Sequence, residues 1–196
     1  SGGSCGATST RPTGSSATAS GGGTAGKLRG VNLLAIETST RRLSVALWRD
    51  GGIAERAENL PSGGSERLLP WVNELLAEAG LRLSDLDGIA FGAGPGSFTG
   101  LRLAAGCAQG LAWGLGLPVL GVCSLEALAL QSGEDRVFAC LDARMNEVYS
   151  AAYLNGTESL PPAVGPAGGV AVPPGGGWVG IGDGFAVHGD ALAARL

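Results

Sequence analysis

The order of strand and helix patterns is the feature that most constrains what this chain can fold into. Three strand patterns with alternating apolar residues come first, at 31–38, 43–47 and 53–58. Helix patterns then alternate with short apolar strands: helices at 62–80, 99–116 and 124–130, and strands at 88–92 and 119–122. This alternation predicts an α/β fold with a mixed sheet whose later strands are parallel.

A weak internal repeat follows these elements. Sliding the chain by 105 residues superposes Ile36–Glu37 on Leu141–Asp142 and Leu43 on Val148, within strand patterns at 137–142 and 148–154. After them come a Pro/Gly-rich segment at 160–177, a strand at 178–181 and a helix near the end of the chain. We therefore expect a first lobe over 31–132 and a second, truncated lobe over 133–196.

The first 30 residues differ in composition from the rest. They are rich in Gly, Ser, Thr and Ala, and their charges are Arg11, Lys27 and Arg29. Such a segment does not build a core, so we expect a disordered extension at 1–30; a transit peptide is the alternative. The remaining residues carry 10 arginines, no lysine and 17 acids, which excludes RNA binding by bulk charge.

Two further features bear on localisation. The uncharged stretch between Arg102 and Glu126 is long enough to cross a bilayer, but Gln109 lies inside it and Pro118 divides it, so we expect no membrane span. The four cysteines form no CxxC pair, and the chain has one histidine, so neither a zinc cluster nor a disulfide framework is indicated. This composition fits a cytoplasmic protein.

The glycine-rich segment 92–102 follows a predicted strand and opens a helix. Glycines allow a tight turn there, and hydroxyls beside free helix N–H groups could face a phosphate. The alternative is a capped turn between strand and helix, and no lysine follows to complete a nucleotide-binding P-loop. The candidate anion-binding residues are Gly94, Gly96, Ser97, Thr99 and Gly100.

The helix at 99–116 carries glycines four residues apart, at Gly106, Gly110 and Gly114. Each glycine lowers helix stability by about 1 kcal/mol relative to Ala in a helix interior. We therefore expect a compensating close approach of another backbone to this helix. The residues leave open whether that approach is to the sheet or to another molecule. The preceding helix carries more apolar residues than one stripe needs, which favours a partner.

Two acids end equivalent strands of the repeat, Glu37 and Asp142. Together they could flank a cleft that holds a divalent metal or works as an acid/base pair. The alternative is that each carboxylate caps a turn at a strand end. Ser124 is expected to cap the helix that it opens. His188 stands at no recognisable spacing from a nucleophile.

Four segments in order carry a family resemblance: 36–40 (IETST), 65–70 (SERLLP), 94–102 (GPGSFTGLR) and 141–149 (LDARMNEVY). Together they resemble the TsaB (YeaZ) family of glycoprotease-like (peptidase M22) proteins. This family provides the accessory subunit of the bacterial machinery that makes threonylcarbamoyladenosine in tRNA. The resemblance runs from about residue 33 to 184.

The resemblance implies an actin-like ATPase (ASKHA, ribonuclease H-like) fold of two duplicated lobes. It also implies a TsaD-type catalytic partner, which moves threonylcarbamoyl to N6 of the adenosine following the anticodon, and a TsaE-type ATPase that joins them. Self-association as a homodimer and ATP or ADP at the interface with partners are further implications. Contact with tRNA is expected to be indirect.

The family's pairing surface falls on the helices at 65–79 and 99–114. The residues implied are Leu68, Leu69, Trp71, Val72, Leu75, Arg102, Leu103, Gly106, Cys107, Gly110 and Gly114. The catalytic subunit's metal-binding histidines are absent here, so we expect no catalytic residue, no metal and a non-catalytic scaffold. Two alternatives stay open: an M22-type protease or weak ATPase that uses the Glu37/Asp142 cleft, and a self-dimerising remnant without a partner.

Overall fold

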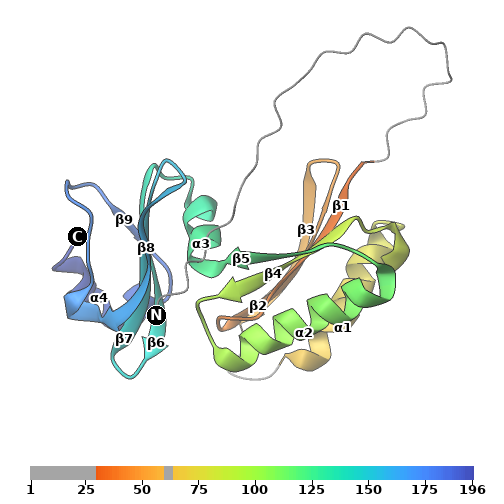
Figure 1. The fold of residues 1–196 in the computed structure, drawn as a ribbon, viewed down its shortest axis with the longest axis horizontal. Helices are drawn as coiled ribbons and strands as arrows, with labels where there is room; N and C mark the ends of the chain where they lie inside the picture. The colour runs from red at the N-terminus through yellow and green to blue at the C-terminus, as the bar shows by residue number, and fades with distance from the viewer. Residues whose placement is uncertain (1–29, 60–63) are drawn as a thin grey trace, which may run out of the picture.

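The structure is a computed structural model that describes residues 30–59 and 64–196. The extension predicted at 1–30 lies outside the described residues except for Gly30, and so do residues 60–63, which include the predicted start of the first helix. The described chain forms two lobes, each built on its own sheet, with helix α3 (Ser124–Ser132) between them (Figure 1).

A five-stranded sheet forms the first lobe, in the order β3-β2-β1-β4-β5. The first three strands, β1 (Asn32–Glu37), β2 (Arg42–Arg49) and β3 (Gly52–Asn59), are antiparallel neighbours. The other two, β4 (Gly88–Gly94) and β5 (Val119–Cys123), run parallel to β1. The predicted mixed sheet arises because tight turns join the first three strands, whereas a helix precedes β4 and another precedes β5.

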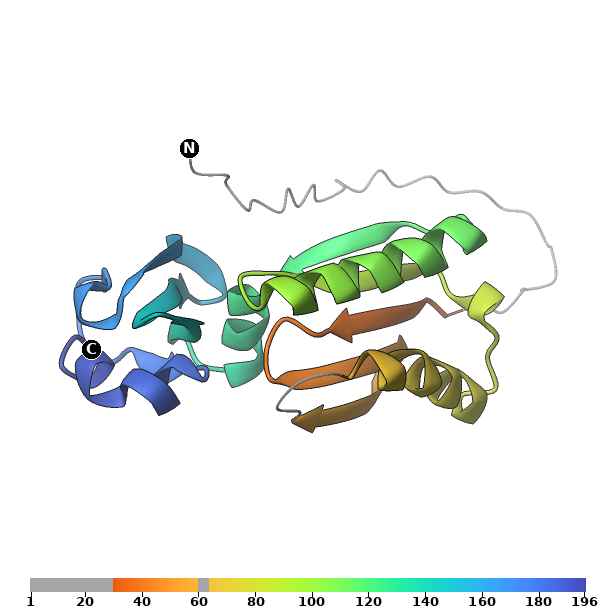
Figure 2. The same ribbon diagram turned by 90° about the horizontal axis from the view of Figure 1, so that it is seen from below.

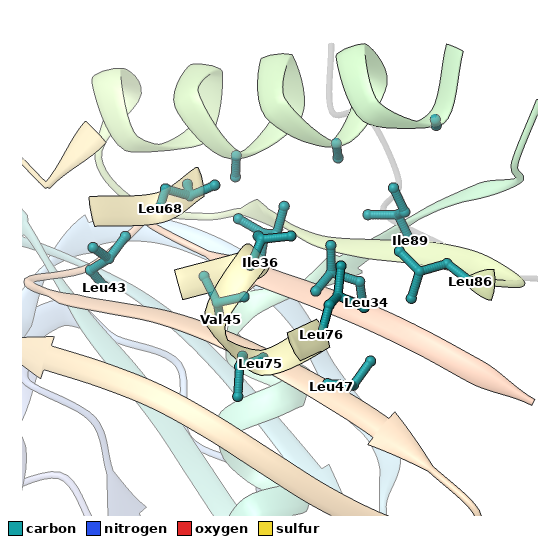
Figure 3. Close-up of a cluster of buried hydrophobic side chains, with 14 residues drawn as sticks. Leu34, Ile36, Leu43, Val45, Leu47, Leu68, Leu75, Leu76, Leu86 and Ile89 are labelled. Carbon is teal, nitrogen blue, oxygen red and sulfur yellow. The ribbon is translucent and has the colours of Figure 1, made fainter. Parts of the chain in front are cut away.

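Helices α1 (Ser65–Glu78) and α2 (Phe98–Leu115) cover one face of this sheet (Figure 2), and the short 3-10 helix η1 (Leu83–Asp85) leads from α1 to β4. Alternate residues of β1 and β2 point into the core and meet the inward face of α1 (Figure 3). These core residues are Leu34, Ile36, Val45, Leu47, Leu68, Val72, Leu75 and Leu76. From α2 come Ala104, Ala108 and Ala112, whose small side chains let the helix lie close to the sheet.

The second lobe repeats the topology of the first. Its sheet has the order β8-β7-β6-β9, which matches β3-β2-β1-β4, and a fifth strand is not seen in the described part of this lobe. The strands are β6 (Arg136–Arg144), β7 (Glu147–Leu154), β8 (Thr157–Pro166) and β9 (Val179–Ile181). The predicted α/β fold of two duplicated lobes is therefore confirmed.

Different helices cover the two faces of the second sheet. Leu125 and Ala129 of α3 pack with Val137 and Ala139 of β6 on one face. On the other face, Phe138 and Cys140 pack with Leu192 of α4 (Gly184–Ala193) and with Ala167 of the 3-10 helix η2 (Ala167–Gly169). Because α3 also contacts β4 and β5, it joins the two lobes.

Three sequence expectations need correction. First, the strand β8 occupies part of the Pro/Gly-rich segment. It is an edge strand, and Pro161 and Pro162 fall in a bulge between the paired Leu160 and Ala163, where no ladder hydrogen bond is needed.

Second, the two equivalent hairpins of the repeat differ in length by one residue. Glu37 pairs with Ser44, whereas Asp142 pairs with Val148, so a slide of 105 residues holds for the first strand of each hairpin but not for the ladder partner in the second.

The third correction concerns α3, whose N-cap lies one residue before the predicted capping position. Cys123 is its N-cap, and Ser124 is its first helical residue, with its hydroxyl turned towards the first lobe. Within the described residues, none of the helices combines the length and the apolar character that crossing a membrane requires.

The inward face of α1 can be tested by substitution in the full chain. Leu75→Ala should lower the free energy of unfolding by about 2–5 kcal/mol, because Leu75 is 1% exposed and its truncation leaves a cavity. The matched change Leu69→Ala on the same helix should cost about 0.5 kcal/mol or less, because Leu69 is 47% exposed. Urea unfolding followed by circular dichroism measures both values. Equal losses would contradict this orientation of α1.

Candidate partner-binding surface

Helix α2 has two stripes of small residues that face opposite environments. Ala104, Ala108 and Ala112 are buried against the sheet. The three glycines of the other stripe are exposed, and a Cβ added at any of them would meet no atom within 4 Å: Gly106, Gly110 and Gly114. The alternative that these glycines allow close approach to the sheet is therefore wrong, because the alanines make that contact.

Large side chains surround the glycine stripe on the outer side of α2. Trp113 is 92% exposed and lies three residues from Gly110, which makes the two neighbours on the helix surface. At the start of the helix, Phe98 is exposed and the guanidinium of Arg102 lies 3.6 Å from the centre of its ring. Leu69 of α1 is also exposed. We call the following set on α2 the outer face: Phe98, Arg102, Gly106, Gly110, Trp113 and Gly114.

Sequence reasoning missed Phe98 and Trp113. The signal was available, since both are large aromatic residues in a helix whose remaining positions are dominated by Ala and Gly. An exposed Trp or Phe beside small residues is typical of surfaces that bind another protein.

Three residues predicted for partner binding do not lie on this surface. Leu68, Val72 and Leu75 are buried in the core of the first lobe, because they form the stripe of α1 that faces the sheet. Three others are half-buried and pack against that core: Trp71, Leu103 and Cys107. Burial raises the pKa of the Cys107 thiol, so it stays protonated at neutral pH.

The turn between β4 and α2 packs tightly against the turn after β1. A Cβ at Gly100 would lie 1.9 Å from the carbonyl oxygen of Thr38, and one at Gly96 would lie 2.6 Å from that of Ser39. The backbone N–H of Ser97 donates to the Ser39 carbonyl at 2.6 Å, and the Thr38 hydroxyl donates to the Gly100 carbonyl at 2.5 Å. These glycines are therefore explained by close approach of two chain segments.

This packing corrects part of the predicted anion site. The space beside Gly96 and Gly100 is filled by Thr38 and Ser39, and Leu101 lies beside Gly94, whose φ is +96°. The Ser97 hydroxyl accepts a hydrogen bond from the Gly100 N–H as the N-cap of α2. The capped-turn interpretation holds for the glycines, whereas Ser97 and Thr99 remain exposed.

The Glu37 carboxylate holds three segments together. It accepts hydrogen bonds from the backbone N–H of Ser39 at 2.5 Å and from the hydroxyl of Ser124 at 3.3 Å. The Ser39 and Ser124 hydroxyls lie 3.0 Å apart. A Cβ at Gly92 would lie 2.0 Å from this carboxylate, so a side chain there would displace it. Glu37 thus ties the end of β1 to the turn that follows it and to the start of α3.

The Asp142 carboxylate has different partners. It accepts from the backbone N–H of Arg144 at 3.0 Å, and its own N–H donates to Asp183 at 3.0 Å. The Nε2 atom of His188 lies 3.5 Å from an Asp142 carboxylate oxygen, a pairing that the sequence did not indicate. Burial, with nearby Asp183 and Asp142, raises the pKa of the Cys140 thiol to about 12, so this cysteine is not an activated nucleophile.

The two carboxylates of the predicted Glu37/Asp142 cleft are engaged with separate parts of the chain. Each carboxylate bonds to its own segments, and the two share no hydrogen-bond partner among the described residues. Over 30–59 and 64–196, no three His, Cys, Asp or Glu side chains are grouped so that they could hold a metal ion. Both carboxylates fit the alternative in which they fix turns at strand ends.

The two environments of α2 glycines lead to opposite expectations for one substitution. Gly110→Ala should raise the free energy of unfolding of the monomer by about 1 kcal/mol, because the added methyl meets open space and Ala favours the helix. Gly100→Ala should lower it, because the methyl would overlap the Thr38 carbonyl. Urea unfolding at low protein concentration measures both; the same sign for both would contradict the two-faced description of α2.

Comparison with known proteins agrees with the fold. A family model described as "TsaD: tRNA N6-adenosine threonylcarbamoyltransferase" matches residues 62–168. The solved structure of YeaZ from Pseudomonas aeruginosa is 44% identical in sequence and superposes with a TM-score of 0.77, over 83% of this chain and 80% of that one.

Two curated relatives are similar in sequence. The tRNA threonylcarbamoyladenosine biosynthesis protein TsaB of Escherichia coli is 46% identical over 63% of this chain and 55% of that protein. Its namesake in Haemophilus influenzae is 46% identical over 62% of this chain and 53% of that protein. This chain spans about half the length of these relatives. It belongs to the glycoprotease-like TsaD family and, within it, to the TsaB (YeaZ) proteins.

Proposed function

We propose that this chain is a non-catalytic subunit in the biosynthesis of threonylcarbamoyladenosine in tRNA. In this role it binds and activates a TsaD-type catalytic subunit through the outer face. The names of the relatives support the pathway, and the exposed glycine stripe of α2 is the observation that carries the role.

The outer face suits a helix of a partner protein. Three glycines on one stripe leave open space beside the α2 backbone, so a second helix can approach it closely. The exposed Trp113 and Phe98 lie on the same helix and supply the aromatic anchors that dominate the energy of many protein interfaces. Burial of both rings by a partner would remove the largest exposed apolar side chains of α2 from water.

The chemistry of the lobes supports a role without catalysis. Glu37 and Asp142 hold turns and helices in place, and the Cys140 thiol is protonated and buried. In this proposal the catalytic subunit supplies the reacting groups, a TsaE-type ATPase joins the pair, and any ATP or ADP binds between subunits. A homodimer through the same outer face would compete with the catalytic subunit.

The test is a titration of the chain with a TsaD-type subunit, with complex mass measured by light scattering after size exclusion. Gly110→Leu should raise the Kd at least about 30-fold, because a leucine there would occupy the space through which a partner helix approaches the α2 backbone. Ala127→Leu, at an exposed position of α3, is the matched control and should leave the Kd unchanged.

The stability of both variants must first be compared by urea unfolding, since the proposal requires that Gly110→Leu leaves the monomer folded. Full affinity of a folded Gly110→Leu variant would contradict the proposed surface. In a reconstituted tRNA modification assay, the same variant should lose the stimulation that the unaltered chain provides.

A further inference from the structure

Two arginines stand apart from the others in this protein. Of the ten arginines in the described residues, five form ion pairs with carboxylates: Arg42, Arg49, Arg56, Arg67 and Arg82. Another three bond to a carbonyl or stack on a ring: Arg102, Arg136 and Arg195. In the described part of the chain, the guanidinium groups of Arg41 and Arg144 have none of these partners. Both residues are exposed.

The duplication places these two arginines in equivalent turns. Arg41 lies in the turn between β1 and β2, and Arg144 is the last residue of β6, where the chain enters the turn to β7. Both turns lie on the lower side of the molecule in Figure 1, on either side of the junction between the lobes, and Figure 2 shows that side facing the viewer. The start of α2, with Arg102, lies beside the first turn, because Ser97 bonds to Ser39 there.

The turn that presents Arg144 uses unfavourable backbone conformations. Arg144, Met145 and Asn146 all have positive φ, at 65°, 52° and 66°. Positive φ is disfavoured for residues with a Cβ. By contrast, the β2–β3 and β7–β8 turns place a glycine after a small polar residue, as Asp50–Gly51 and Asn155–Gly156.

Strained backbone of this kind clusters at binding sites and switch regions, which makes this turn a candidate site of contact with another molecule. Met145 at the tip is 95% exposed, so packing within the chain does not explain it. Two hydrogen bonds at the base of the turn fix its conformation: the Asp142 carboxylate accepts from the N–H of Arg144, and the N–H of Asp142 donates to the Asp183 carboxylate.

We infer that Arg41 and Arg144 contact the phosphate backbone of tRNA on this side of the molecule. Guanidinium groups without a carboxylate partner are ready to form paired hydrogen bonds with phosphate oxygens. The exposed hydroxyls of Ser97 and Thr99, at the positive end of the α2 dipole, add donors on the same side. The inference rests on the proposed function and departs from the expectation that tRNA contact is indirect.

The net charge of −4 does not conflict with this inference. Bulk charge sets non-specific binding by the isolated chain, whereas two local contacts add to the affinity of a complex whose catalytic subunit also holds the tRNA. Two acids lie beside Arg144: Asp142, whose carboxylate accepts from the Arg144 N–H, and Glu147, its ladder partner, which forms no ion pair with it. Because Glu147 is negatively charged, its replacement by Gln should strengthen tRNA binding.

The experiment measures tRNA affinity of the complex with a TsaD-type subunit by fluorescence anisotropy over a range of salt concentrations. The variant Arg41→Gln/Arg144→Gln should weaken binding severalfold and lower the slope of log K against log salt by about 1.5. The matched control Arg49→Gln/Arg82→Gln removes two ion-paired arginines and should leave the slope unchanged. Glu147→Gln should tighten binding.

Complex formation is measured in parallel by light scattering. A complex of normal mass whose tRNA affinity and salt slope are unaffected by Arg41→Gln/Arg144→Gln would overturn the inference and leave the proposed function intact. If that variant weakens ATP binding while the tRNA slope stays unchanged, the arginines serve a mononucleotide and the inference is likewise overturned. Failure of the unaltered chain to form the complex would overturn the proposed function and the inference together.

Discussion

Close contact between the turn after β1 and the first turn of α2 is the constraint on which the first lobe depends. The Thr38 carbonyl occupies the space that any side chain at Gly100 would need, and Ser97 bonds to Ser39. This contact fixes how α2 is rotated about its axis above the sheet. Its alanine stripe then completes the core, and its glycine stripe is left on the outside.

The same contact explains how α2 stays folded against the sheet despite the three glycines in its interior. Gly106, Gly110 and Gly114 weaken α2, and a Cβ at each would meet no atom of the described chain within 4 Å, which supports the proposed binding of a partner there. The buried leucines of α1 and the alanines of α2 supply stability on the inner side. In the proposed function, stability and partner binding are thus assigned to opposite faces of one helical layer.

Duplication has given the two lobes the same sheet order but different uses of the acid after the first strand. Glu37 reaches across to Ser124 and joins the first lobe to α3. Asp142 instead stabilises its own turn, together with Asp183 and His188. One carboxylate is therefore part of the junction between the lobes, and the other orients the exposed turn that carries Arg144.

Local sequence patterns determined most of the elements and the α/β class, because apolar periodicity and turn residues act over a few positions. They did not determine which stripe of α2 faces the sheet, since Ala104, Ala108 and Ala112 have the same spacing as the glycines. Nor did they determine that His188 lies beside Asp142, or that the Arg41 and Arg144 guanidinium groups form no ion pair with the described residues. Those outcomes depend on contacts between distant segments, which the tertiary structure alone decides.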